Sequence, residues 1–136
     1  MPTPVQLQKL KAAAKAAAGR AYAPYSKFRV GAAVLTASGK IYSGCNVENA
    51  SYGLTNCAER TAIFSAVAAE EKKLKLRCVV VYTPTPTATA PCGACRQVIY
   101  EFGPAARVIS CCAGRDQMDV SIGALLPGAF GPADLA

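Results

Sequence analysis

Histidine is absent from the 136 residues of this chain. Its absence excludes both the usual general base and the commonest protein metal ligand. Charged residues are also few, at 17%, while 52% of the residues are apolar, which excludes the disordered class and indicates a packed core. Any metal or acid–base site in this chain must therefore be built from cysteine, aspartate or glutamate.

The chain lacks the features typical of exported and membrane proteins. The N-terminal segment has no continuous apolar run like that of a secretory signal, and no apolar stretch is long enough to span a bilayer. The seven cysteines are an odd number, which favours reduced thiols over a disulfide framework. We therefore expect a cytoplasmic location and no membrane partner.

A dense basic block is also missing, although the net charge is +7. The lysines and arginines are spread along the chain, which is typical of solvated surface charge. We therefore expect no nucleic-acid partner. The competing hypothesis is a module that edits or binds single strands, and salt-dependent retention of such strands would support it.

The length and the hydrophobic pattern predict one α/β domain covering residues 1–136. Helices are expected at residues 5–18, 57–71 and 92–102, and strands at residues 28–36, 41–45, 78–82 and 108–112. The first two strands flank a glycine turn and predict a hairpin, whereas residues 57–71 are apolar on nearly every face and predict an interior helix. This order indicates a sheet with helices on both faces, joined in part by right-handed crossovers.

Two thiol motifs stand where the second and third helices are expected to begin. One is Cys57-Ala58-Glu59-Arg60, and the other is Pro91-Cys92-Gly93-Ala94-Cys95-Arg96. Side chains in a first helical turn lean toward the N-terminus, whose unpaired amides stabilise thiolates. Two such helix starts that meet would gather three soft ligands. Three ligands with one open position are typical of a catalytic zinc site.

The acid–base partner predicted for this metal site is Glu59, two residues after the first thiol. It would reach water at the metal without binding the metal itself and would serve as a proton shuttle. Arg60 and Arg96 each follow a thiol motif directly and are candidates to donate hydrogen bonds to sulfur or to pair with charge. Arg60 is the stronger candidate of the two.

Two other interpretations of the thiols remain open at this point. Cys92 and Cys95 at a helix start also fit a thioredoxin-like redox pair, which would require a disulfide between them. A structural zinc site would need a fourth ligand. The remaining cysteines lie in expected strands and are interpreted as core residues: Cys45, Cys78, Cys111 and Cys112.

The combined pattern of Cys57-Ala58-Glu59 and Pro91-Cys92-x-x-Cys95 resembles the signature of the zinc deaminases. The similarity to the small homotetrameric cytidine deaminases runs nearly from end to end. It includes Tyr25-Ser26-x-Phe28-x-Val30-Gly31-Ala32-Ala33, the run from Gly44 to Gly53 with Asn46-Val47-Glu48-Asn49, and Leu125-Leu126-Pro127-x-x-Phe130. The Asn-Val-Glu-Asn run favours this family over the blasticidin deaminases, which lack it.

The resemblance implies a three-layer α/β/α fold with a central mixed sheet of about five strands. It implies one Zn²⁺ per subunit and hydrolysis of cytidine and deoxycytidine to uridine, deoxyuridine and ammonia, a reaction of pyrimidine salvage. Water activated by zinc would attack carbon 4 of the ring, and Glu59 would protonate ring nitrogen 3 and then the departing amine.

The resemblance also assigns expected substrate contacts. Asn46 and Glu48 would hydrogen-bond the sugar, Phe28 would pack against the pyrimidine, and Ala58 would complete the substrate-binding positions in the same chain. The expected assembly is a homotetramer with active sites shared between subunits. In it, Phe130 of one subunit would close over the pyrimidine held by another, and Tyr52 would approach across a second contact.

Overall fold

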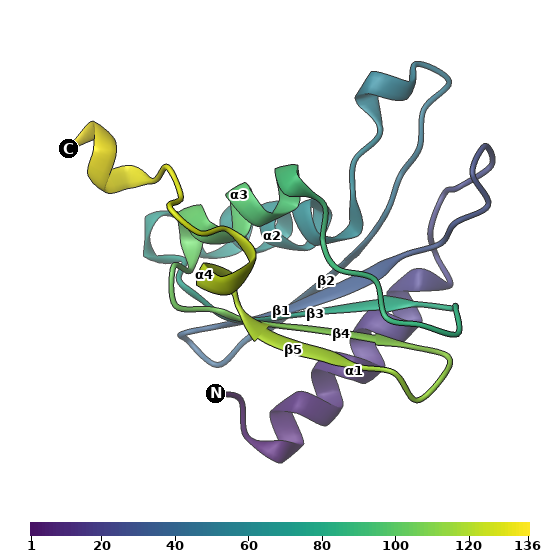
Figure 1. Ribbon diagram of the computed structural model, residues 1–136, viewed down its shortest axis with the longest axis horizontal. Helices are drawn as coiled ribbons and strands as arrows, with labels where there is room; N and C mark the ends of the chain where they lie inside the picture. Colours follow the sequence, from purple (N-terminus) through teal and green to yellow (C-terminus); the bar gives the residue numbers. More distant parts are fainter.

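A mixed five-stranded sheet lies at the centre of the computed structural model, which describes residues 1–136 (Figure 1). The strands are β1 (Gly31–Thr36), β2 (Ile41–Cys45), β3 (Leu76–Thr83), β4 (Arg107–Cys112) and β5 (Met118–Ser121), arranged in the order β2-β1-β3-β4-β5. Only β3 and β4 pair in parallel. The longer helices are α1 (Pro4–Ala18), α2 (Ala58–Glu70) and α3 (Gly93–Phe102). The expected α/β fold with a mixed sheet of about five strands is confirmed.

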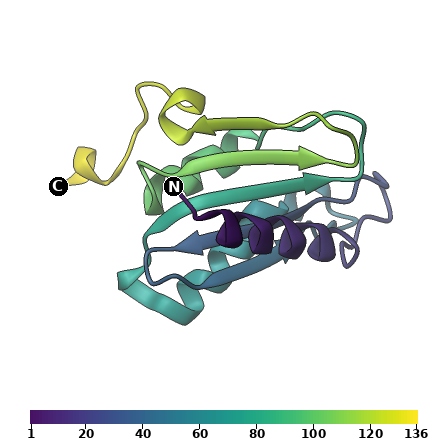
Figure 2. The same ribbon diagram turned by 90° about the horizontal axis from the view of Figure 1, so that it is seen from below.

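The helices form one layer on each face of the sheet. Figure 2 shows α1 lying across one face, while α2 and α3 cover the other (Figure 1). Alternate residues of β3 divide between these layers: Val79 and Val81 belong to a core of 14 buried residues under α2 and α3, and Val80 belongs to a core of seven under α1. The larger core therefore lies beneath the two helices that begin with the thiol motifs.

The β1–β2 hairpin is confirmed, but its first strand begins at Gly31, three residues later than expected. The preceding segment is held by Asn46, the residue after β2, through its side chain and through one backbone hydrogen bond from Asn46 N to Val30 O at 3.2 Å. The Asn46 side chain accepts a hydrogen bond from Val30 N at 2.9 Å and donates one to Phe28 O at 2.8 Å. These bonds satisfy backbone groups that a longer strand would have paired, and they leave Phe28 and Val30 on the wall of a cavity.

Helix α2 begins and ends as expected, but it is not enclosed on all sides within one chain. Its buried face packs closely on β2, where a Cβ atom at Gly44 would lie 2.4 Å from Ala62 N. The opposite face carries Phe64, which is 50% exposed. The expectation of a fully interior helix is wrong for the single chain, because the sheet covers only one side of α2.

The C-terminal part of the chain differs most from the sequence prediction. No strand was predicted at β5, and the short helices α4 (Ile122–Leu125) and η3 (Pro132–Leu135) follow it. Of the four cysteines expected in the core, only Cys78 is buried, whereas Cys45, Cys111 and Cys112 are partly exposed because they lie near the ends of their strands. None of the helices combines the length and apolar character needed to cross a membrane.

Candidate active site

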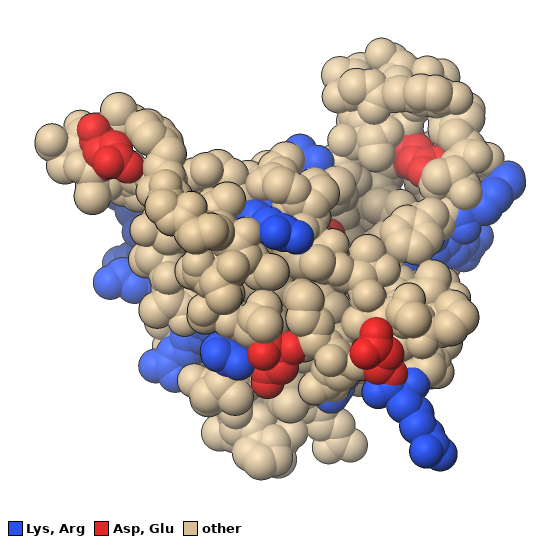
Figure 3. All heavy atoms as spheres, viewed as in Figure 1, with Lys and Arg blue, Asp and Glu red and all other residues tan.

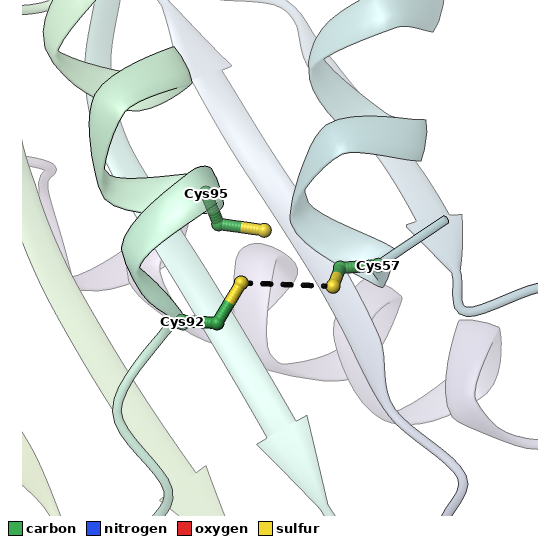
Figure 4. Close-up of side chains that lie close together, drawn as sticks. All are labelled: Cys57, Cys92 and Cys95. Carbon is green, nitrogen blue, oxygen red and sulfur yellow. Dashed lines mark hydrogen bonds between the residues drawn. The ribbon is translucent and has the colours of Figure 1, made fainter. Parts of the chain in front are cut away.

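The three motif thiols meet between the starts of α2 and α3. Cys57 and Cys92 are the N-cap residues of these two helices, and Cys95 lies in the first turn of α3. Figure 4 shows the three sulfur atoms pointing toward a common point between the helices. The two helix starts therefore bring together residues that are separated by more than thirty positions in the sequence, as the motif spacing predicted.

The geometry of the thiols fits a metal ion. All three sulfur atoms lie within 4.8 Å of one another, and the Sγ atoms of Cys57 and Cys92 are 3.8 Å apart. Sulfur ligands at about 2.3 Å from a tetrahedral zinc require separations of this size. No fourth cysteine or carboxylate belongs to the group. The donor set fits zinc with one position left open, which is the catalytic kind of site.

The electrostatics around Cys57 favour its thiolate. Hydrogen bonds from Cys95 and from the Arg60 guanidinium lower the pKa of Cys57 to about 5, although desolvation acts in the opposite direction. Arg60 Nη2 donates to Cys57 Sγ at 3.2 Å. The helix N-termini add positive potential at the same point. Arg60 therefore lies against the sulfur of Cys57, the contact predicted for it, beside a group of thiols that could hold a metal ion.

Glu59 lies beside the thiols but outside their group. Its side chain projects from the first turn of α2 and is only 5% exposed. Desolvation raises the pKa of this carboxyl group, and the negative charge on Cys57 raises it further. Both effects favour the protonated carboxyl group over the carboxylate, which suits a residue that must accept and then donate a proton.

Arg96 does not contact the thiols, in contrast to Arg60. Its Nε donates to Pro91 O at 2.7 Å, and its Nη1 donates to Leu125 O at 3.0 Å. The side chain thus ties the loop before Cys92 to the end of α4. Of the two candidate arginines, the structure brings only Arg60 to sulfur.

A cavity of about 290 Å³ opens beside the thiols and holds most of the predicted substrate positions. Its thirteen lining residues include, among those predicted, Phe28, Asn46, Glu48, Cys57, Ala58, Glu59 and Cys92. It is largely apolar near Phe28, Val30 and Val81, and polar toward Asn46 and Glu48. A small apolar cavity with a few convergent polar groups is typical of a small-molecule site.

The carboxylate of Glu48 is held in place by the loop that precedes β1. It accepts hydrogen bonds from Tyr25 N at 2.9 Å, from Ser26 N at 3.1 Å and from the Ser26 hydroxyl. The bond from the Ser26 side chain lowers the pKa of Glu48, and the backbone bonds act in the same direction. Glu48 therefore presents an ionised carboxylate at the rim of the cavity.

The structure does not bring Tyr52 and Phe130 into this cavity. A second hollow of about 270 Å³ shares Ser26, Glu48 and Thr55 with the cavity and extends to Tyr52. Tyr52 nevertheless is 75% exposed, and Phe130 is 58% exposed. Both residues lie on segments that project from the body of the chain (Figure 1). The space-filling view shows the surface hollowed at the foot of the η1 (Tyr52–Leu54) projection (Figure 3).

Several residues that line the cavity were not predicted from the sequence. Ser26 anchors Glu48, and Thr89 and Ala90 reach the cavity from the proline-containing loop before α3. Ser26 lay inside the quoted Tyr25-Ser26-x-Phe28 run, so its position was a usable signal. No local pattern marked Thr89 and Ala90, because only the folding of the loop carries them to the thiols.

Comparisons with known proteins agree with this geometry. The model of the family described as "Cytidine and deoxycytidylate deaminase zinc-binding region" matches residues 4–112. The cytidine deaminase of Sporosarcina psychrophila is 48% identical over 134 residues, which cover 97% of this chain and 96% of that protein.

Solved structures show the same similarity. The cytidine deaminase from Burkholderia pseudomallei superposes with a TM-score of 0.83 at 52% identity, covering 90% of this chain and 98% of that one. The enzyme from Mycobacterium tuberculosis superposes with a TM-score of 0.78 at 37% identity, covering 92% and 97%. With the family model matching most of its length and a relative nearly half identical from end to end, the chain belongs to the cytidine and deoxycytidylate deaminase zinc-binding family.

Proposed function

We propose that this protein is a zinc-dependent cytidine deaminase that hydrolyses cytidine and deoxycytidine to uridine and deoxyuridine with release of ammonia. The observation that carries the proposal is the meeting of three thiols with a buried carboxyl group, Glu59, beside a cavity of about 290 Å³. Its cellular setting would be pyrimidine salvage in the cytoplasm. The relatives named above, all cytidine deaminases, support the assignment.

Cys57, Cys92 and Cys95 would hold the zinc ion, one per subunit. Zinc bound to three protein ligands acts as a Lewis acid and lowers the pKa of water at its open position. Arg60 donates a hydrogen bond to the Cys57 sulfur and withdraws part of the thiolate charge, which would otherwise weaken that acidity. The chain would therefore supply three sulfur ligands and, in Arg60, a positive charge that offsets part of their negative charge.

Glu59 would move the protons of the reaction. Its carboxylate would take one proton from the attacking water and deliver it to nitrogen 3 of the pyrimidine. It would then take the second proton, from the hydroxyl group now on carbon 4, and deliver it to the departing amine. Burial raises the pKa of this group, which favours its protonated form between the acceptance and the delivery of each proton. Burial also excludes bulk water, which would compete for the same proton.

The cavity wall favours a nucleoside over a nucleotide. None of the thirteen residues lining the cavity, and none of the five lining the adjoining hollow, is lysine or arginine. A phosphate group would meet the ionised Glu48 carboxylate with no cationic side chain in the wall to bind it. Sugar hydroxyl groups, in contrast, can donate to Glu48 and to Asn46 Oδ1, whose carbonyl oxygen has a second lone pair.

Phe28 and Ala58 would contact the base. Phe28 supplies an apolar surface against which the pyrimidine packs, and it is 40% exposed in the single chain. Ala58 lies in the first turn of α2, where backbone amides have no acceptor inside the helix. These amides are free to bind a polar edge of the substrate.

The working assembly would be a homotetramer in which subunits complete one another's sites. Tyr52 and Phe130 are large apolar side chains on projecting segments, and each is more than half exposed. Side chains of this kind are typical of subunit contacts. Phe130 of one subunit would close over the pyrimidine held by another, and Tyr52 would reach the site across a second contact.

The test is a direct assay on the purified protein with cytidine, deoxycytidine, cytosine and cytidine monophosphate. We expect ammonia release from the two nucleosides, little from the base or the nucleotide, and about one zinc per chain by metal analysis. Deamination of single-stranded RNA or DNA in place of nucleosides would instead support the nucleic-acid hypothesis. A Cys92–Cys95 disulfide without zinc would support the redox hypothesis.

A further inference from the structure

Helix α3 holds the C-terminal segment as well as two of the thiols. Gln97 Nε2 donates a hydrogen bond to Phe130 O at 2.7 Å. One turn further along α3, the Tyr100 ring packs on Gly131, where a Cβ atom would lie only 2.7 Å from Tyr100 Cε2. Gly131 is buried by this contact, whereas Phe130 beside it is 58% exposed. The backbone is thus anchored while the Phe130 ring is left uncovered.

After Phe130 the chain is held by a local hydrogen bond within the C-terminal segment. Gly131 N donates to Asp134 Oδ2 at 2.8 Å, which fixes the start of η3. At its base, Leu125 O accepts the hydrogen bond from Arg96. Residues 126–136 form a C-terminal arm. Helix α3 therefore holds this arm at two points, through Arg96 at Leu125, just before the arm begins, and through Gln97 at Phe130. Figure 1 shows this arm projecting away from the body of the chain.

We propose that Gln97 and Tyr100 are positioning residues that hold the C-terminal arm so that Phe130 is presented outward, to the active site of a neighbouring subunit. This inference rests on the proposed function, because Phe130 acts there across a subunit contact. Cys92 and Cys95 lie at the start of the same helix. A single α3 helix would therefore place two metal ligands in its own subunit and Phe130 over the substrate of the neighbouring subunit.

The physical reason for such an anchor is the composition of the arm. Residues 127–132 contain two glycines and two prolines, and Gly128 has a positive φ of 64°. Without contacts to α3, this stretch would sample many conformations, and each encounter with a partner would have to order it again. An arm already held in one orientation loses less conformational entropy when Phe130 closes over a substrate.

The first test measures the arm directly, by amide hydrogen exchange of the zinc-loaded protein followed by mass spectrometry. Gln97→Leu keeps the size of the side chain but removes the donor, and Gly131→Ala forces the arm and the Tyr100 ring apart. Both variants should accelerate exchange in residues 126–136 and leave α2 unchanged. Gln8→Leu, on an exposed position of α1, and Gly123→Ala, whose Cβ would meet no atom closer than 3.9 Å, are the matched controls. Unchanged exchange of the arm in both test variants would overturn the proposal.

The second test asks whether the anchor acts through Phe130. Loss of one hydrogen bond predicts a fall in kcat/KM of about threefold to tenfold for Gln97→Leu, with zinc content unchanged. In a Phe130→Ala background the same substitution should have no further effect, because the ring that it positions is already gone. An equal fall in both backgrounds would show that Gln97 acts by another route and would sink the proposal.

The Phe130→Ala variant separates the shared site from the positioning role of Gln97 and Tyr100. If Phe130→Ala itself keeps full kcat/KM, the shared-site part of the proposed function is wrong, and the positioning role is wrong with it. If Phe130→Ala lowers kcat/KM but Gln97→Leu and Gly131→Ala do not, only the positioning role is wrong. A loss of zinc in Gln97→Leu would indicate damage to α3 and would contradict a role confined to the arm.

Discussion

The thiol end of the site lies against the core of the chain, although Cys92 itself is exposed, whereas the two projecting segments extend away from that core (Figure 1). Cys95 and Ala58 are fully buried, and the helices that carry the thiols rest on a core of 14 buried residues. Tyr52 and Phe130, in contrast, are 75% and 58% exposed, and neither lines the cavity beside the thiols. One chain therefore brings together the thiols and Glu59, the predicted proton shuttle, but leaves the expected cover of the substrate outside.

This difference has a physical basis in how each part is held. The thiols are placed by helix starts that pack on the sheet, so the free energy of folding also organises the metal ligands. The projecting segments leave the side chains of Tyr52 and Phe130 exposed, and these side chains are covered only when another surface meets them. We infer that the metal chemistry is a property of the subunit, whereas substrate closure is a property of the assembly.

Removal of a metal ligand should have the largest effect. Cys57→Ala, Cys92→Ala or Cys95→Ala should each reduce activity to background and weaken zinc binding by more than about 100-fold, because two protein ligands seldom hold zinc tightly. Metal analysis after gel filtration measures the loss. Cys45→Ala and Cys111→Ala are the controls and should keep one zinc per chain. Stoichiometric zinc in any of the three ligand variants would contradict the assignment of that ligand.

Glu59→Gln should have the next largest effect and should separate catalysis from metal binding. The amide keeps the size of the side chain but cannot shuttle protons, so kcat should fall about 100-fold to 10,000-fold. Zinc content, measured on the same sample, should stay at one per chain. A variant with a near-native rate would rule out the shuttle role, and a variant without zinc would leave Glu59 with a structural task instead.

Mixed oligomers should show whether the two ends of the site come from different subunits. After subunit exchange between equal amounts of Glu59→Gln and Phe130→Ala chains, roughly a quarter of the sites would combine an intact Glu59 with an intact Phe130. The activity should therefore exceed the sum of the two separate variants. Strict additivity despite exchange demonstrated by mass spectrometry would refute sharing. A fully active monomer in sedimentation would refute it as well.

The smallest effect is expected far from the site, where α2 ends against the hairpin. Glu70 accepts hydrogen bonds from Thr36 Oγ1 at 2.9 Å and from Ser38 Oγ at 3.0 Å. Desolvation raises the pKa of Glu70, but bonds from Thr36, Tyr42 and Ser38 outweigh it, so the net pKa lies below the ordinary value. The stability that these bonds provide is therefore present above the unfolded pKa, about 4.3, and is lost as the pH falls through the lower folded value.

Glu70→Gln accordingly should lower the melting temperature by a few degrees at pH 7. The difference from the wild type should shrink as the pH falls below about 4, where Glu70 itself becomes neutral. Thermal unfolding of both proteins between pH 7 and pH 3 measures it, and kcat at pH 7 should be unchanged. A difference that stays constant with pH would show that the carboxylate charge contributes nothing to this network.

The main elements of the fold could be predicted from local patterns. The α1 helix ends before Gly19, and the apolar runs around Val80 and Ile109 form central strands, as expected. The β5 strand was missed because only four residues, Met118–Ser121, form it, and their burial depends on pairing with β4. The exposed face of α2 was missed because hydrophobicity alone does not show which side of a helix the sheet covers.

The sequence by itself predicted the donor set and its chemistry. With no histidine in the chain, the groups available at the two helix starts were Cys57, Cys92, Cys95 and Glu59, and the resemblance of their pattern to the zinc deaminase signature favoured them over the alternatives. Each of the two motifs is a short run of neighbouring residues, so it can be recognised in the sequence without knowledge of the fold.

Only the tertiary structure decided how these groups are combined with the rest of the molecule. It separated Arg60, which donates to Cys57 sulfur, from Arg96, which ties loop to helix. It placed Asn46 against residues 28–30 and left Phe130 outside its own cavity. These outcomes depend on contacts between segments distant in sequence, and neither composition nor periodicity encodes where such segments meet.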